Sequence, residues 1–238
     1  MRFDILTLFP EMFGHTLGGS IIGRAQSDGK LTVNCVNIRD FAGNKHNKVD
    51  DYPYGGGAGM IMQPQPIYDA YMSVAQGLNY KPFTVYLTPQ GKVFRQSTAK
   101  RLSKMKHIVL LCGHYEGVDQ RVLDEIVDME ISIGDYVLTG GEIPAMAVVD
   151  ATARLLPGVL SSTDAYSNES LQGGLLEHPQ YTRPPEWMGR EVPEILISGH
   201  HGNIEKWKRE QSIGTTLKKR RSLLSKANLT DKEKKLLD

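Results

Sequence analysis

Apolar residues in the first 160 positions fall into short runs and helical repeats that follow one another in turn. Residues 2–9 form a mostly apolar run, and Leu31, Val33 and Cys35 alternate with polar neighbours, as on one face of a strand. Strands are predicted at 2–9, 31–38, 83–87, 107–112 and 130–133, and helices at 65–76, 96–106, 118–125 and 142–156. Because strands alternate with helices, the pattern predicts an α/β fold in which helices cover a parallel sheet.

The pattern changes after residue 160. Residues 161–172 are polar, offer little to bury and are typical of an exposed linker. Two helices are predicted beyond it, at 203–212 and 215–225, parted near Gly214. The spacing of Thr230 and Glu233 matches a capping box at the start of a last short helix. The sequence therefore predicts an α/β domain at 1–160, an interdomain linker at 161–175 and a small all-helical domain at 176–238.

Composition supports a globular protein. The hydrophobic fraction is 40% and the charged fraction is 23%, and no apolar run reaches the ~20 residues that a membrane helix needs. Cys35 and Cys112 cannot form a disulfide framework and lack the spacing of a structural zinc site, which favours a reducing compartment. The first ten residues include Asp4 and Pro10, which is unlike a signal peptide. We expect a soluble, cytoplasmic protein.

Basic residues are concentrated in two segments of the chain, although the formal net charge is only +1. Residues 92–106 carry six Lys or Arg and no acid, and residues 206–226 carry eight against the single acid Glu210. Each run alone is typical of a solvated helix face. Two such runs in a nearly neutral chain favour a phosphate-rich partner.

Three turn-rich segments come directly after predicted strands: 87–91, 112–119 and 133–144. Ligands of open α/β folds bind at the carboxyl edge of the sheet, where these segments should converge, although each also suits an ordinary turn. Gly134, Gly140 and Gly141 would expose main-chain groups suited to an adenine edge. Neither a Gly-x-x-x-x-Gly-Lys-Ser/Thr loop nor a Gly-x-Gly-x-x-Gly motif occurs at these places. The loop-like stretch 44–62, with its Tyr-Gly-Gly-Gly-Ala-Gly run, could be a lid over this site or a plain loop.

These segments together closely resemble the bacterial tRNA (guanine-N1)-methyltransferases of the SPOUT class. The matching stretches are Phe-Asp-Ile-Leu-Thr-Leu-Phe-Pro, Tyr-Gly-Gly-Gly-Ala-Gly-Met, Leu-Thr-Pro-Gln-Gly, Cys-Gly-His-Tyr-Glu-Gly, Ile-Gly-Asp-Tyr-Val-Leu-Thr-Gly-Gly-Glu and Leu-Leu-Glu-His-Pro-Gln-Tyr-Thr-Arg-Pro. They occur in the same order over Met1 to about Lys226.

The resemblance implies a deep trefoil knot, S-adenosylmethionine as cofactor, and methylation of the guanosine just 3′ of the anticodon, guanosine-37. It also implies a homodimer with shared active sites, a linker that orders over the partner's pocket when tRNA binds, and a helical domain that grips the tRNA. Magnesium could be required, but the sequence assigns no metal site. By resemblance, the cofactor-binding residues are Tyr86, Leu87, Thr88, Pro89, Gln90, Gly113, Tyr115, Glu116, Ile133, Gly134, Asp135, Tyr136, Val137, Leu138, Gly140, Gly141 and Pro144.

The resemblance also assigns the two catalytic groups. Arg154 matches the arginine that stabilises the guanine, and position 169 matches the catalytic aspartate of the family. Here the residue is Glu169, whose carboxylate reaches one methylene further. Glu116 and Glu177 are therefore kept as alternative bases.

Two other functions remain possible from the sequence. A related knotted methyltransferase could act on a ribose 2′-OH, although a base-deprotonating carboxylate in the linker argues against it. A catalytically inactive RNA-binding protein could have kept the fold and lost the base at position 169. The intact Arg154 and the glycine-rich loops favour the methyltransferase.

Overall fold

The computed structural model describes residues 1–160, 170–171, 173–234 and 237. The chain divides into two compact units, Met1–Ser161 and Ser162–Asp238. Among the described residues, no helix combines the length and apolarity needed to cross a membrane.

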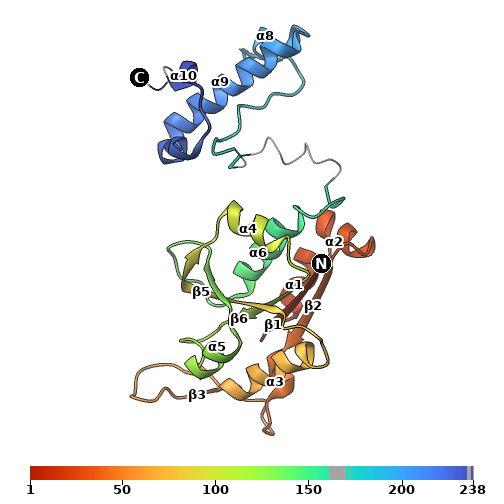
Figure 1. Cartoon of the computed structure of the whole chain (residues 1–238), viewed down its shortest axis with the longest axis vertical. Coiled ribbons are helices and arrows are strands. Elements are labelled where there is room, and N and C mark those ends of the chain that lie inside the picture. The colour runs from red at the N-terminus through yellow and green to blue at the C-terminus, as the bar shows by residue number, and fades with distance from the viewer. Residues whose placement is uncertain (161–169, 172, 235–236, 238) are drawn as a thin grey trace. The chain divides into compact units, whose positions relative to one another are not determined.

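The first unit alternates strands with helices, as the sequence predicts (Figure 1). Its elements are β1 (Arg2–Thr7), α1 (Glu11–Leu17), α2 (Ser20–Ser27), β2 (Thr32–Asn37), the 3₁₀ turn η1 (Ile38–Phe41), β3 (Asp50–Asp51), β4 (Ile61–Met62), α3 (Pro64–Ala75), β5 (Phe83–Val93), α4 (Gln96–Leu102), β6 (His107–Cys112), α5 (Gln120–Ile126), β7 (Met129–Ser132) and α6 (Glu142–Ala153).

Five of these strands form one sheet in the order β2-β1-β6-β5-β7. Every neighbouring pair in it is parallel. The prediction of a parallel α/β sheet is confirmed. Because the strands are parallel, the segments after β5, β6 and β7 leave the sheet at the same edge.

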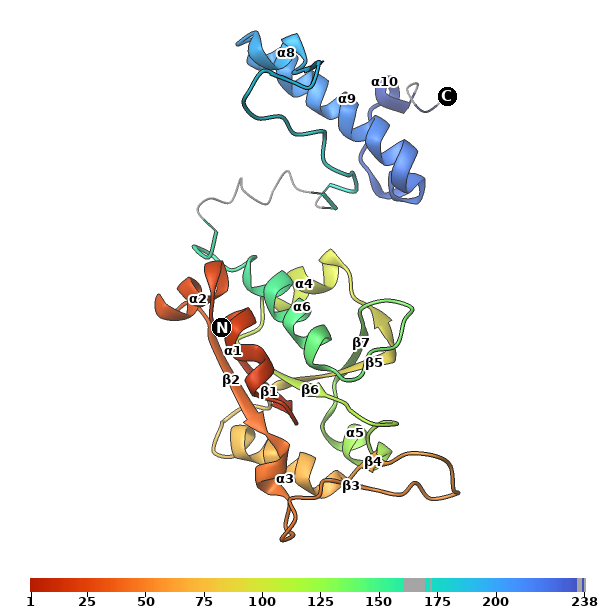
Figure 2. The same ribbon diagram turned by 180° about the vertical axis from the view of Figure 1, so that it is seen from behind.

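Helices cover both faces of this sheet (Figures 1 and 2). Alternate residues of the central strand β6 enter two separate cores: Ile108 and Leu110 pack with α1, α2, α4 and α6, whereas Val109 and Leu111 pack with α3 and α5. A strand buried on both faces is almost entirely apolar, which explains the run His-Ile-Val-Leu-Leu-Cys.

Two helices of this unit were not predicted. The turn-like residues Pro10 and Gly14 around α1, and Gly18, Gly19 and Gly23 around α2, mask the helical repeat. Tertiary burial stabilises both helices, since their apolar side chains enter the core on the α6 side of the sheet. The stretch 44–62, predicted as a loop, contains the short antiparallel pair β3–β4.

The second unit is built around one long helix. Its elements are β8 (Glu186–Trp187), β9 (Arg190–Glu191), α8 (Glu194–Ile197), α9 (His201–Arg220), the 3₁₀ segment η2 (Arg221–Lys226) and α10 (Asp231–Lys234). The predicted interruption near Gly214 is wrong, because α9 continues through it. Ile213 and Thr216 are buried on either side of Gly214, and this packing outweighs the ~1 kcal/mol that a helical glycine costs.

The expectation that this unit is entirely helical is also wrong. β8 and β9 pair as a hairpin whose two loop residues, Met188 and Gly189, have φ angles of 53° and 72°. Two positive φ angles suit the tight turns that join antiparallel strands. The capping box is confirmed: the Glu233 side chain accepts a hydrogen bond from the Thr230 N–H (2.7 Å), and the Thr230 hydroxyl accepts one from the Glu233 N–H (3.3 Å).

Candidate functional site

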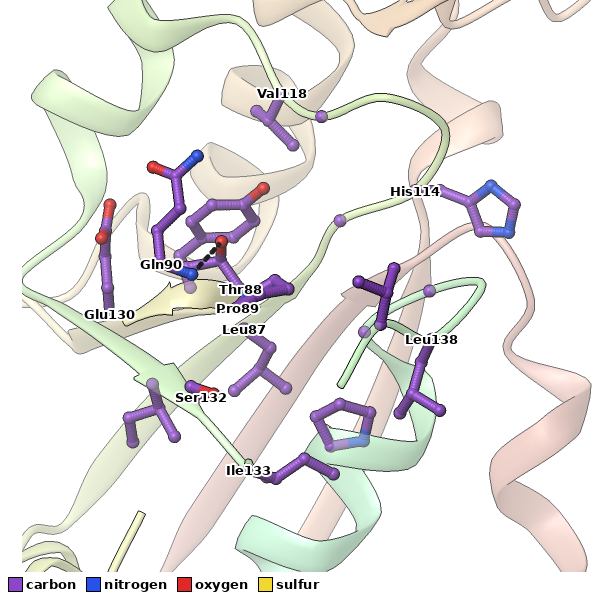
Figure 3. Close-up of a pocket in the computed structure, with 18 of the residues that line it drawn as sticks. Leu87, Thr88, Pro89, Gln90, His114, Val118, Glu130, Ser132, Ile133 and Leu138 are labelled. Atoms are coloured by element: carbon purple, nitrogen blue, oxygen red, sulfur yellow. Dashed lines mark hydrogen bonds between the residues drawn. The ribbon is translucent and has the colours of Figure 1, made fainter. Parts of the chain in front are cut away.

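A cavity of about 410 Å³ lies at one edge of the sheet, between residues 86–90 within β5 and the loops that follow β6 and β7. Figure 3 shows side chains from all three loops, among them Thr88, Ile133 and Leu138, around the same space. Sixteen of the seventeen residues expected from the resemblance to bind cofactor line this cavity; Asp135 does not. The structure thus brings three distant segments together, and their binding of a cofactor stays a prediction.

The first wall of the cavity is formed by residues within β5 that do not pair with β7. Strand β5 pairs with β7 as far as Leu87, opposite Ile131, and resumes with Lys92 opposite the same residue. Residues 88–91 therefore leave the ladder, and Thr88, Pro89 and Gln90 line the cavity. A Cβ on Gly91 would lie 2.6 Å from the Glu130 carbonyl carbon and 2.7 Å from that of Ile131. Only glycine allows this approach of backbone to backbone.

The second wall follows β6 and is held by aromatic packing. A Cβ on Gly113 would lie 2.9 Å from the Tyr86 hydroxyl oxygen, so the tyrosine ring lies directly over the glycine. Burial raises the pKa of Tyr86 above its usual value. Further along, Tyr115 has a φ of 58°, and its hydroxyl accepts a hydrogen bond from Arg39 (3.3 Å).

His114 also belongs to this wall, although no role was predicted for it from the sequence. Its ring lies between Phe9 and Tyr115, with centroid separations of 5.2 and 4.9 Å. In Figure 3 the ring points away from Leu87 and Thr88. Its Nδ1 is buried and has no hydrogen-bond partner among the described residues.

The glycine-rich stretch 54–60 lies against the same wall. The Glu116 N–H donates to the Met60 carbonyl (3.1 Å), and the Met62 N–H donates to the Gly117 carbonyl (2.9 Å). Gly59 faces the Glu116 side chain, whose Oε1 would be 2.7 Å from a Cβ there. These contacts place the end of this stretch beside the cavity-lining Glu116, and closure over the cavity stays a prediction.

The third wall is the segment between β7 and α6. The Gly141 N–H donates to the Gly113 carbonyl (2.9 Å), and Gly140 pairs with His114. A Cβ on Gly141 would lie 2.6 Å from the Cys112 Cα, so the two loops meet backbone to backbone. Tyr136, Val137 and Leu138 extend from this wall and are largely exposed.

Arg154, one of the two expected catalytic groups, does not line this cavity within one chain. Pro144 lines the cavity in the first turn of α6, and Arg154 directly follows the last turn. Ten residues of helix separate them, which corresponds to about 15 Å. Arg154 is not among the cavity-lining residues.

Of the three candidate bases, Glu116 lines the cavity. Glu177 belongs to the second unit, where its N–H donates to the Ser170 hydroxyl (2.9 Å) and its carboxylate accepts from Gln180 (2.6 Å). Glu169 lies outside the described residues. Across the part of the chain that the structure describes, no three His, Cys, Asp or Glu side chains come together as a metal site.

Several lining residues had not been expected to contribute, including Ile61, Gln120, Leu123 and Glu130. Each lies in or beside a regular element rather than in a turn-rich loop. Nothing in their local sequence distinguishes them from ordinary strand or helix residues. Only the proximity of β4, α5 and β7 to the three loops brings them to the cavity.

Comparison with known proteins identifies the family. The family described as tRNA (Guanine-1)-methyltransferase TrmD matches residues 1–226. The chain belongs to this family. The resemblance seen in the sequence is confirmed, and the match includes every segment that lines the cavity.

Individual members of the TrmD family are similar over nearly their whole lengths. A protein named tRNA (guanine-N(1)-)-methyltransferase from Ruminiclostridium cellulolyticum is 58% identical over 226 residues, covering 95% of this chain and 97% of its own. Proteins of the same name from Alkaliphilus oremlandii and Clostridioides difficile are 55% and 54% identical, covering 100% and 96% of this chain and 98% and 99% of theirs.

Proposed function

We propose that this protein is a tRNA (guanine-N1)-methyltransferase that transfers a methyl group from S-adenosylmethionine to N1 of guanosine-37, in the cytoplasm. The observation that carries the proposal is that one cavity gathers the three loops of a chain whose family match spans residues 1–226. Membership of the TrmD family indicates the class of reaction, and we place the cofactor in the cavity.

The cavity fits S-adenosylmethionine in size and lining. About 410 Å³ lies within the 300–1,000 Å³ typical of small-ligand sites. Gly113, Gly140 and Gly141 line the cavity without side chains, so main-chain N–H and C=O groups other than the paired Gly141 N–H and Gly113 carbonyl can face it. Such N–H and C=O groups can pair with the edge of an adenine, and the Leu87 and Ile133 side chains can contact its faces. The sulfonium of S-adenosylmethionine supplies an electrophilic methyl group, so the chain itself has to activate only the acceptor.

Activation of the acceptor requires removal of a proton. Guanine N1 carries a hydrogen and is a poor nucleophile until that hydrogen leaves. We assign this role to Glu169, with Glu116 and Glu177 as alternatives; a positioned carboxylate contributes roughly 10²–10⁴-fold to rate. Arg154 then stabilises the negative charge that develops on O6.

The distance between Arg154 and the cavity supports an active site shared by two subunits. About 15 Å of helix separates Arg154 from Pro144 in one chain. A homodimer in which the Arg154 of one subunit serves the cavity of the other would bring the two together. Exposed Met12, Val137, Leu138 and Ile143 lie beside the cavity and are suited to such an interface.

We also propose that residues 83–141 form the trefoil knot of the SPOUT class and that the unit containing 176–238 holds the tRNA. The excursion at 88–91 and the backbone contact between Gly141 and Gly113 support a chain that crosses itself closely in this region. In the second unit, Lys218, Lys219 and Arg220 end α9 and are available to phosphates, so binding should weaken with salt.

Incubation of the enzyme with unmodified tRNA transcripts and labelled S-adenosylmethionine, followed by nucleoside analysis, tests this function. We expect 1-methylguanosine from a transcript with guanosine at position 37 and none when adenosine replaces it. A 2′-O-methylated nucleoside would show a ribose methyltransferase instead. Retention of tRNA without any methyl transfer would show an RNA-binding protein that lacks the activity.

A further inference from the structure

The carboxylate of Glu142 is buried immediately behind the loops of the cavity. Glu142 is the first residue of α6 and is 3% exposed. It does not line the 410 Å³ cavity; it borders a second hollow of about 190 Å³, together with Phe9, Met12 and His114. A carboxylate is costly to bury unless hydrogen bonds satisfy it, so its partners are informative.

Two hydrogen bonds in series link the Phe9 N–H, the Thr7 hydroxyl and the Glu142 carboxylate, and each donates towards the carboxylate. The Phe9 N–H can only donate, and it donates to the Thr7 hydroxyl oxygen (3.0 Å). The hydroxyl hydrogen of Thr7 is therefore free to donate to Glu142 Oε1 (2.7 Å). Both side chains are buried, and 135 positions of sequence separate them. Glu142 thus accepts, and the end of β1 is tied to the start of α6.

The other carboxylate oxygen contacts the cofactor loops. A Cβ on Gly140 would collide with Glu142 Oε2 and would lie 2.9 Å from the His114 ring. Gly140 in turn pairs with His114, and Gly141 donates to the Gly113 carbonyl. Burial and the negative charge of Glu142 raise the pKa of the adjoining Cys112 thiol. The carboxylate therefore lies where three segments meet: 7–9, 112–114 and 140–142.

We propose that Glu142, fixed by Thr7, is a positioning residue that holds the Gly113 and Gly140–Gly141 backbones at the spacing the cofactor requires. The inference rests on the proposed function for the identity of the ligand. Glu142 acts through the loops and not on the methyl group. Its effect should therefore be the same for S-adenosylmethionine and for the product S-adenosylhomocysteine, which lacks the sulfonium charge.

Calorimetric titration of the full-length protein with each ligand tests this proposal. Thr7→Val removes the hydroxyl while keeping the shape, and Glu142→Ala removes the carboxylate. Each should raise both dissociation constants about tenfold, as loss of a buried hydrogen bond predicts. Thr7→Ser restores the hydroxyl and should recover affinity to within about threefold of the unaltered protein.

Thr152→Val is the matched control. Thr152 is fully buried on the same helix, and its hydroxyl has no hydrogen-bond partner among the described residues. Removing that hydroxyl should leave both affinities within about twofold. All titrations are made well below the melting temperature of each variant, so that unfolded protein does not change the measured dissociation constants.

A second measurement needs no ligand. Amide hydrogen exchange of Gly141, whose N–H donates to the Gly113 carbonyl, should quicken at least fivefold in the cofactor-free Thr7→Val protein and stay unchanged in Thr152→Val. In the double variant Thr7→Val/Glu142→Ala, the dissociation constants should be less than about threefold higher than in Glu142→Ala alone, because the two residues act as one unit.

The proposal would be overturned if Thr7→Val and Glu142→Ala bound both ligands as tightly as Thr152→Val does. It would also be overturned if only the affinity for S-adenosylmethionine fell, because Glu142 would then act by its charge. Failure of the unaltered protein to bind either ligand would instead refute the proposed function and this inference with it.

Discussion

Replacing Gly141 with alanine should damage the proposed cofactor site by forcing the loops at Gly113 and Gly141 apart. The added Cβ would lie 2.6 Å from the Cys112 Cα and 3.0 Å from the Gly113 nitrogen, whereas ordinary contact begins at 3.4 Å. Both obstructing atoms are backbone, so no side-chain rotation can relieve the overlap. The loops must separate by about 0.8 Å, which is the difference between 3.4 and 2.6 Å.

That displacement has two measurable costs. Overpacking of this kind typically destabilises a protein by ~1–3 kcal/mol, which urea unfolding would detect. A misplacement close to 1 Å at a reacting centre costs ~100-fold in rate. We therefore expect Gly141→Ala to bind S-adenosylhomocysteine at least tenfold more weakly in calorimetry and to lose methyl transfer in proportion.

Gly14→Ala is the control for Gly141→Ala. Gly14 lies in α1, and a Cβ there would have no described atom within 4 Å. Because alanine favours a helix over glycine, this variant should be more stable by ~0.5–1 kcal/mol and should bind normally. If Gly141→Ala bound ligand as Gly14→Ala does, the close contact between the loops would not define the site.

Three further predictions concern charged side chains. Arg154→Ala should abolish turnover while calorimetry shows cofactor affinity within a few-fold, and loss of cofactor binding would contradict the separate roles proposed. Glu169→Gln should lower the rate roughly 10²–10⁴-fold at every pH, and a rate equal to that of the unaltered enzyme across the pH range would mean that another group is the base. Hydrogen bonds from Arg209 and the Thr230 N–H lower the pKa of Glu233 to about 2. The contribution of Glu233 to stability should thus be complete above the ordinary pKa of 4.5 and disappear as the pH falls towards 2. Glu233→Gln should flatten this dependence of stability on pH, which unfolding monitored by Trp207 fluorescence would measure.

Much of the architecture could be predicted from short stretches of sequence. The strands at 2–9 and 107–112 were recognisable because an apolar strand in a parallel sheet is buried on both faces. The edge strand at 31–38 was recognisable because its apolar and polar residues alternate. The capping box at Thr230 could be predicted for a similar reason, since its hydrogen bonds span only three residues. The loops of the cavity were recognisable because turns need glycine and proline.

Other features have no local signal. Asp4 lies inside a buried strand, where its carboxylate accepts hydrogen bonds from the neighbouring Arg2 and, at 2.5 and 2.8 Å, from the distant His107 and Asn34. The helices α1 and α2 contain glycines and are stabilised by the core that they enter. Whether a residue of this kind is stable depends on partners that lie far away in the sequence.

The sequence by itself therefore determined the alternation of strands and helices, the three loops and the family, because periodicity, turn chemistry and motifs are local properties. Only the tertiary structure decided that Glu142 meets Thr7 and that Pro144 lines the same cavity as Thr88 and Gly113. The physical reason is that such contacts depend on where the folded chain passes in space, and spacing along the sequence does not fix that.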